Sequence, residues 1–128
     1  MIVDSSAVIA LVLREPGWEE LAAKLAAAAT AAIGAPTLAE TGLVLTAKLG
    51  RKAPALLLRF LQEAGLAVVP FAEDHWRTAV EAYARFGKRR HAAGLNFGDC
   101  LSYAVARLSG QPLLLVGDDF SKTDLPRA

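Results

Sequence analysis

Acidic residues occur in this sequence where an apolar segment ends or a helix is expected to begin. They stand at four such places: Asp4, Glu40, Asp99, and the pair Asp118 and Asp119. Carboxylates gathered at one site repel each other, and a divalent cation removes that conflict. Mg²⁺ and Mn²⁺ take oxygen ligands and usually keep several waters, so a few carboxylates are enough. Such an ion activates a water and stabilises the attacking and leaving oxygens, so the acids predict phosphoryl chemistry if they meet.

The expected strands direct two of these acidic places to one edge of a sheet. Asp4 follows the apolar run Met1–Val3, and Asp118 and Asp119 follow the apolar run 113–116. The carboxyl ends of parallel strands lie on the same side, where the sites of α/β proteins form. A structural explanation exists as well, because Asp4 can cap the next helix and the other two acids are ordinary turn residues.

Glu40 and Asp99 are expected close to the start of helices. Glu40 lies one turn into the helix that follows the weak strand 31–33, which places it at the same edge. Asp99 reaches that edge only if the connection before it folds back. Both acids also fit a capping box, Glu40 with Thr37 and Asp99 with Asn96, in which the carboxylate accepts from a backbone N–H. The prediction of a site therefore depends on the joint pattern and not on one acid.

Short, continuous apolar runs alternate with helical patterns along the chain. Such runs are typical of parallel strands buried on both faces, because alternation would mark a sheet with one face in water. The expected strands are 1–3, 31–33, 66–69 and 113–116. The expected helices begin near Ser5 or Ser6 and then cover 18–29, 37–49, 54–64, 74–86 and 99–109. We predict an α/β fold with a mainly parallel sheet in a single domain, residues 1–128.

The apolar pattern also predicts which surfaces are covered. Helix 37–49 is apolar on nearly every side, so it needs two covers: the sheet and a second subunit. This favours a homodimer. Phe97 is expected in the core, with stacking on a nucleobase as the alternative. Helical spacing assigns further side chains to the core, namely Trp18, Phe60, Trp76, Val80, Tyr83, Leu101, Ala104, Val105 and Leu108.

Charge is nearly balanced over the chain, with a formal net charge of +1, so global basicity does not point to nucleic acid. A local basic run nevertheless precedes Asp99 and suits a phosphate backbone. Its alternative role is a solvated helix end, where cations complement the helix dipole. The run comprises Arg85, Lys88, Arg89, Arg90 and His91.

Composition indicates a compact globular protein, with 54% hydrophobic and 21% charged residues. The single cysteine, Cys100, excludes an internal disulfide and fits a reducing compartment. We expect it to be a small buried apolar side chain. The N-terminus lacks the basic region of a signal peptide, and polar residues interrupt every apolar run before it reaches a membrane span. We therefore expect a cytoplasmic protein without a membrane association.

Four separated motifs together resemble the PIN domain, and more narrowly the VapC toxins of bacterial toxin–antitoxin pairs. They are MIVDSSAVIA, the glutamate in PTLAETGLVL, LNFGDCLSYAVA and LLLVGDDFSKTDL. The resemblance covers nearly the whole chain. It implies a three-layer α/β/α sandwich with a sheet of four to five strands, and Mg²⁺- or Mn²⁺-dependent endoribonuclease activity. It also implies a homodimer and a cognate VapB-type antitoxin that blocks the site.

The resemblance also implies roles for individual residues. Asp4, Glu40 and Asp99 match the three acids of the family's metal site. The fourth acid falls in the pair after the last strand, where the family often has Asn-Asp, so it is assigned to Asp119 with Asp118 as a contributor. Ser6 matches a hydroxyl that orients the first acid, and Asn96 matches the polar residue before the third. Lys88, Arg89 and Arg90 match no family motif, so RNA binding by them stays a local hypothesis.

A second class of function remains open at this stage. The chain is alternatively a non-catalytic PIN-like module that binds RNA or a protein partner. Intact acids favour the enzyme over the module. For the antitoxin, we expect acidic or amphipathic character near the basic run, or a cation inserted among the acids.

Overall fold

A parallel β-sheet organises the chain. The structure is a computed structural model, and it describes residues 1–88, 91–118 and 120–128. Within these residues, four strands pair in the order β3-β2-β1-β4. Every pair is parallel, which confirms the predicted mainly parallel sheet. The strands are β1 (Ile2–Val3), β2 (Ala32–Gly34), β3 (Ala67–Val69) and β4 (Leu113–Leu114).

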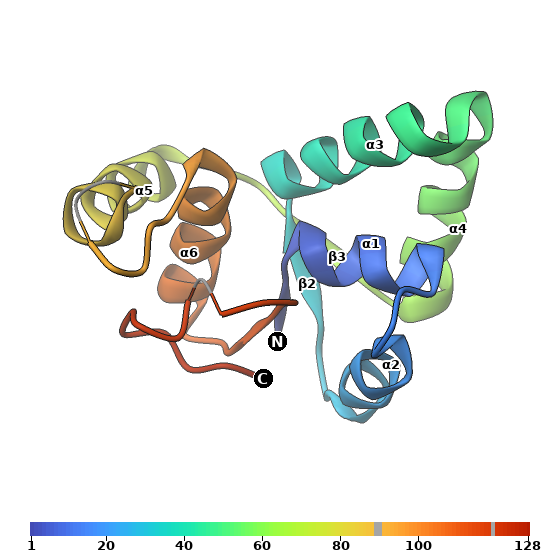
Figure 1. Ribbon diagram of the computed structural model, residues 1–128, viewed down its shortest axis with the longest axis horizontal. Helices are drawn as coiled ribbons and strands as arrows, with labels where there is room; N and C mark the ends of the chain where they lie inside the picture. Colours follow the sequence, from blue (N-terminus) through green and yellow to red (C-terminus); the bar gives the residue numbers. More distant parts are fainter. Residues whose placement is uncertain (89–90, 119) are drawn as a thin grey trace.

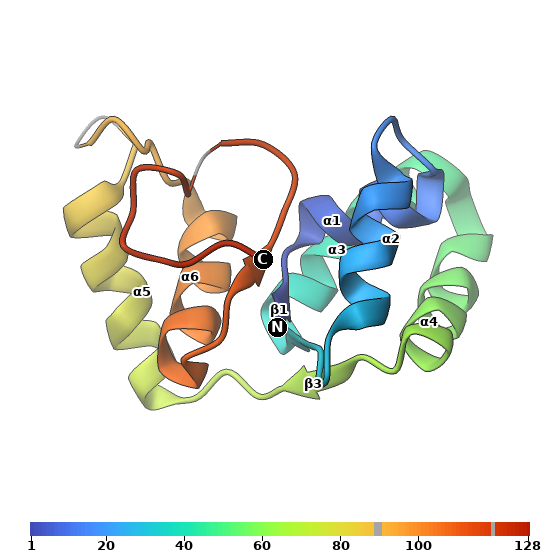
Figure 2. The ribbon, with the colours of Figure 1, turned by 90° about the horizontal axis from the view of Figure 1, so that it is seen from below.

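Helices cover both faces of this sheet. Their bounds are α1 (Ser5–Leu13), α2 (Trp18–Ala27), α3 (Ala35–Leu49), the 3₁₀ helix η1 (Gly50–Lys52), α4 (Ala53–Ala64), α5 (Glu73–Phe86) and α6 (Phe97–Ser109). Helices α5 and α6 lie on one side of the sheet, and α1 to α4 lie on the other (Figures 1 and 2). The predicted three-layer α/β/α fold is therefore confirmed.

The short central strands separate two hydrophobic cores. Ile2 belongs to the core under α5 and α6, whereas the next residue, Val3, belongs to the core under α1 to α4. Leu113 and Leu114 divide in the same way. Successive side chains of a strand point to opposite faces. A strand of two apolar residues therefore serves both cores, which is why the sequence shows short continuous apolar runs here.

The sheet differs from the prediction at its two edges. β4 ends at Leu114, two residues earlier than expected, and Arg127 adds one isolated bridge beside Leu113. β3 was expected to be buried on both faces, yet Ala67 and Val68 are exposed because β3 is the edge strand. Within the described residues, no helix has the length and apolar character needed to cross a bilayer.

The predicted core face of α5 was wrong. Ala79, Ala82 and Phe86 are buried, whereas Trp76 and Tyr83 are 51% and 42% exposed. The two stripes interleave at helical spacing, so periodicity does not select between them. The alanine stripe faces α6 because small side chains let the two helices approach closely. Three more of the expected core residues are exposed: Val80 on α5, and Phe97 and Leu108 on α6.

Candidate active site

A small polar pocket opens at the carboxyl edge of β1 and β4. Its volume is about 130 Å³, and its lining includes Asp4, Glu40 and Asp99. These acids come from the end of β1, the second turn of α3 and the first turn of α6. Residues that lie 36 or more positions apart in the sequence are thus brought to one place, because each lies at or near the N-terminal end of a helix at the same sheet edge.

Asp4 is fixed by three hydrogen bonds. It caps α1, where its Oδ2 accepts from the Ser6 N–H at 3.0 Å and from the Ser6 hydroxyl at 2.6 Å. Its Oδ1 accepts from the Ser102 hydroxyl at 2.5 Å. Asp4 is 6% exposed, so its carboxylate is held in one orientation at the pocket wall. The capping role predicted as the structural alternative is present, and it coexists with a place in the pocket.

Ser6 connects this acid to the segment after β4. Its hydroxyl donates to Asp4 and accepts from the Val116 N–H at 3.0 Å. Ser6 therefore links the carboxylate of Asp4 to the backbone after β4.

Ser102 and Thr37 were not anticipated from the sequence. The two hydroxyl oxygens lie 3.4 Å apart, and both residues are 1% exposed. They link α3 and α6 to Asp4. The available signal was a serine among the apolar residues of a buried helix, because buried hydroxyls require partners.

Glu40 occupies the space that a glycine leaves open. A Cβ placed on Gly98 would lie 2.5 Å from the Glu40 Oε2 atom. The capping box expected for Glu40 is wrong: α3 begins two residues earlier, with Gly34 as its N-cap, and Thr37 bonds elsewhere. Glu40 lines the pocket and makes no hydrogen bond to any of the described residues.

Asp99 and Asn96 form the capping box predicted from the sequence. The Asp99 N–H donates to Asn96 Oδ1 at 2.9 Å, and the Asn96 N–H donates to Asp99 Oδ2 at 3.0 Å. Both residues line the pocket. This capping box fixes the carboxylate of Asp99 in the first turn of α6. Its capping role is therefore compatible with a role in binding a ligand in the pocket.

The acids after β4 are placed differently from the first three. Asp118 is not among the pocket-lining residues; its side chain is 95% exposed and lies 3.5 Å from Arg127. Asp119, to which the fourth acid was assigned, lies outside the described residues. Instead, Leu115, Val116 and Phe120 complete the wall on this side.

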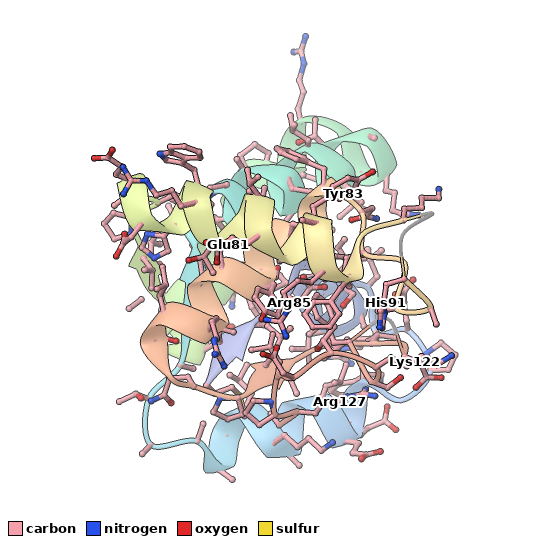
Figure 3. The ribbon with its side chains drawn as sticks, turned by 90° about the vertical axis from the view of Figure 1, so that its left-hand side faces the viewer. Glu81, Tyr83, Arg85, His91, Lys122 and Arg127 are labelled. Atoms are coloured by element: carbon pink, nitrogen blue, oxygen red, sulfur yellow. The ribbon has the colours of Figure 1, made fainter. Side chains whose placement is uncertain are left out.

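The basic run is only partly available to a phosphate backbone. Arg85 lies 3.6 Å from Asp124 and stacks over the Phe86 ring, and Figure 3 shows it between α5 and the C-terminal segment. His91 Nδ1 accepts from the Ala93 N–H at 2.9 Å. Lys88 is exposed. Arg89 and Arg90 lie outside the described residues.

Cys100 is buried beside Asp99, as expected for a small apolar side chain. Burial, with a smaller contribution from the Asp99 charge, raises the pKa of the thiol to about 11. The thiol is therefore protonated at neutral pH and does not serve as a nucleophile.

The chemistry of the pocket's donors suits a hard divalent cation. Three carboxylates face it and supply oxygen atoms, which Mg²⁺ and Mn²⁺ prefer. Over residues 1–88, 91–118 and 120–128, no three His, Cys, Asp or Glu side chains are gathered closely enough to hold one ion. Mg²⁺ usually keeps several waters and needs only one or two protein carboxylates, so the donor set fits a hydrated ion.

The fold and the pocket define an α/β protein with a carboxylate site at the end of its central strand. The profile of the PIN domain matches residues 1–125. Ribonuclease VapC36 of Mycobacterium tuberculosis is 50% identical over 126 residues, which cover 98% of this chain and 91% of the relative. The chain therefore belongs to the PIN domain family and, within it, to the VapC ribonucleases.

Solved structures support the same fold. The crystal structure of Mycobacterium tuberculosis VapC20, a toxin that cleaves the sarcin-ricin loop, has a TM-score of 0.79 at 22% identity and covers 99% of this chain and 97% of its own. The VapBC2 complex of Rickettsia felis, solved with a fragment of promoter DNA, has a TM-score of 0.78 at 17% identity, with coverage of 99% and 96%.

Proposed function

We propose that this protein, acting as a single PIN domain, is a toxin endoribonuclease that hydrolyses RNA phosphodiester bonds with Mg²⁺ or Mn²⁺. The observation that carries the proposal is the meeting of Asp4, Glu40 and Asp99 in one pocket from three separate elements. The 50% identical relative is named as a ribonuclease, which supports the proposal. We propose that it acts in the cytoplasm, where cellular RNA would be its substrate.

In this proposal the acids divide the work of holding the ion and positioning a water. Asp4, Asp99 and Asp119 would hold the ion, Glu40 would orient the attacking water, and Asp118 would contribute. When bound, the ion supplies charge stabilisation for the attacking and leaving oxygens. Ser6 and Asn96 hold two of the acids in place through the hydrogen bonds described above.

The substrate must bring its negative charge close to these carboxylates. Lys88, Arg89 and Arg90 are proposed to hold the phosphate backbone of the RNA. Such contacts release counterions, so binding should weaken as the salt concentration rises.

A VapB-type antitoxin is proposed as the partner that blocks this site. The support is a structural neighbour solved as a VapBC complex. A cationic side chain inserted among Asp4, Glu40 and Asp99 would satisfy the same charges as the metal ion.

A homodimer is proposed from an apolar groove between α3 and the α5–α6 pair. The groove has a volume of about 760 Å³. It is lined by Leu43, Trp76, Val80 and Phe97, which are 74%, 51%, 60% and 78% exposed. Exposed apolar surface of this kind marks interaction sites. In the described part of the single chain, one side of α3, the helix expected at 37–49, is therefore left partly uncovered. A second subunit was expected to cover it.

The test is cleavage of total bacterial RNA by the purified protein in Mn²⁺, beside an EDTA control. We expect discrete fragments that disappear in EDTA and in Asp4→Asn. The matched control is Asp74→Asn, which makes the same chemical change at an exposed residue of α5. If Asp4→Asn cleaves as well as Asp74→Asn, the assignment of Asp4 fails. Mn²⁺ binding without cleavage of any RNA would favour the non-catalytic RNA- or protein-binding module.

A further inference from the structure

We propose that Arg85, Tyr103, Arg107 and Asp124 form an anchor that positions the segment after β4 against the acidic pocket. The four residues are called the anchor cluster, and the described residues 116–118 and 120–125 are called the C-terminal loop. The cluster positions the site and does not touch the substrate. The inference rests on the proposed function, because it concerns metal binding at the same pocket.

The anchor cluster joins three elements at one carboxylate. The Tyr103 hydroxyl of α6 donates to Asp124 Oδ1 at 2.7 Å. Arg85 of α5 and Arg107 of α6 each place Nη1 3.6 Å from Asp124 Oδ2. Tyr103 is 3% exposed, so the strongest contact comes from a residue that is itself fixed in the core. Arg85 and Arg107 are more than half exposed, and such ion pairs alone contribute little.

Charge on the anchor cluster is set by these contacts. Burial would raise the pKa of Asp124, but the Tyr103 hydrogen bond, Arg107 and Arg85 outweigh burial and hold this pKa below its ordinary value. Burial and the bond to Asp124 raise the pKa of Tyr103 to about 12. At neutral pH, an ionised Asp124 therefore faces a protonated phenol, which is the stronger type of hydrogen bond.

The C-terminal loop is held at both ends, and its middle reaches the pocket. At its start, the Val116 N–H donates to Ser6, the residue that orients Asp4. At its end, Asp124 is held by the anchor cluster. Between them, Phe120 is 1% exposed and lines the acidic pocket.

Tight turns connect the two ends of the loop. The Ser121 N–H and hydroxyl donate to the Asp118 carbonyl at 3.0 and 2.7 Å. The Thr123 N–H and hydroxyl donate to the Phe120 carbonyl at 3.1 and 2.8 Å. The second of these turns begins at Phe120 and ends one residue before Asp124, so we expect a displacement at Asp124 to reach the pocket wall at Phe120.

The position of Tyr103 on α6 strengthens this connection. It follows Ser102, which holds Asp4, and it lies on the helix whose first turn contains Asp99. One helix thus supplies an acid, the hydroxyl that fixes a second acid, and the phenol that anchors the C-terminal loop. Partners that orient metal ligands change metal affinity by about 10–100-fold when they are removed.

The test measures Mn²⁺ binding by calorimetry without RNA, together with hydrogen exchange of residues 120–125. The variants are Tyr103→Phe and Asp124→Asn. The matched control is Glu73→Gln, which removes an exposed carboxylate paired with Arg77 on α5. We expect Mn²⁺ binding about tenfold weaker in both variants, with faster exchange in the loop and unchanged binding in the control.

A purely structural role would lower the melting temperature and leave Mn²⁺ affinity unchanged, and that result overturns the proposal. Absence of Mn²⁺ binding in the unmodified protein overturns it as well. If the unmodified protein binds Mn²⁺ but cleaves no RNA, the proposed function fails. The Mn²⁺ affinities of the two variants then decide the role of the anchor cluster alone.

Discussion

Replacing Gly98 by alanine should lower the activity while leaving the stability of the fold nearly unchanged. The new Cβ would lie 2.5 Å from Glu40 Oε2, whereas ordinary contact begins at 3.4 Å, so the carboxylate must move by 0.9 Å, the difference of the two distances. The Glu40 side chain ends in a flexible carboxylate and can retreat at little cost. Alanine also favours a helix over glycine by about 0.5–1 kcal/mol, so the variant should fold with nearly unchanged stability.

Activity should respond much more strongly than stability. A misplacement of about 1 Å at a reacting group costs on the order of 100-fold in rate. The assay is Mn²⁺-dependent RNA cleavage beside thermal denaturation. The matched control is Gly42→Ala in α3, where the nearest atom to a new Cβ is Leu57 Cδ2 at 3.5 Å, an ordinary contact. This control should retain full cleavage. Equal cleavage by Gly98→Ala and Gly42→Ala would refute the importance of the Glu40 position.

Three further outcomes are expected. Ser102→Ala should lower the free energy of unfolding by about 1–3 kcal/mol and reduce cleavage, because Asp4 loses a buried donor; denaturation and cleavage assays check this. Asp124 has a lowered pKa, so its stabilisation is present above the ordinary value of 3.8 and is lost as the pH falls further. Asp124→Asn should therefore remove part of the acid-induced loss of stability, measured by denaturant titration at several pH values. Leu43→Glu should give a monomeric mass in light scattering while the unmodified chain is dimeric. A monomeric unmodified chain would contradict the homodimer.

The sequence was sufficient for the existence of the four strands and for their parallel direction, but not for their order in the sheet. Short apolar runs such as Met1–Val3 belong to strands covered on both faces, and helices between them require parallel crossovers. Where a helix carries two apolar stripes, the sequence was insufficient to predict which of them is buried. In α5, the stripe through Ala79 and Ala82 is buried because α6 packs there, and only the tertiary structure reveals this choice.

Part of the candidate site could also be predicted from the arrangement of the strands. Asp4 and Glu40 follow from strand direction, because the ends of parallel strands share an edge. Ser102 and Gly98 could not be assigned, because their roles depend on contacts between α6 and elements far away in the sequence. A spacing rule that works within one helix carries no information about such contacts.

The two hydrogen bonds that connect Thr37, Ser102 and Asp4 have a defined direction of donation. The Ser102 hydroxyl has a single proton and donates it to Asp4, so the bond between Ser102 and Thr37 must be donated by Thr37. The line therefore runs from Thr37 through Ser102 to Asp4. Once Ser102 is lost, Thr37 has no further part in it, so Thr37→Val and Ser102→Ala together should cost less than the sum of their separate effects. The two positions lie 65 residues apart and are thus epistatic. A substitution at one of them changes the effect of a substitution at the other.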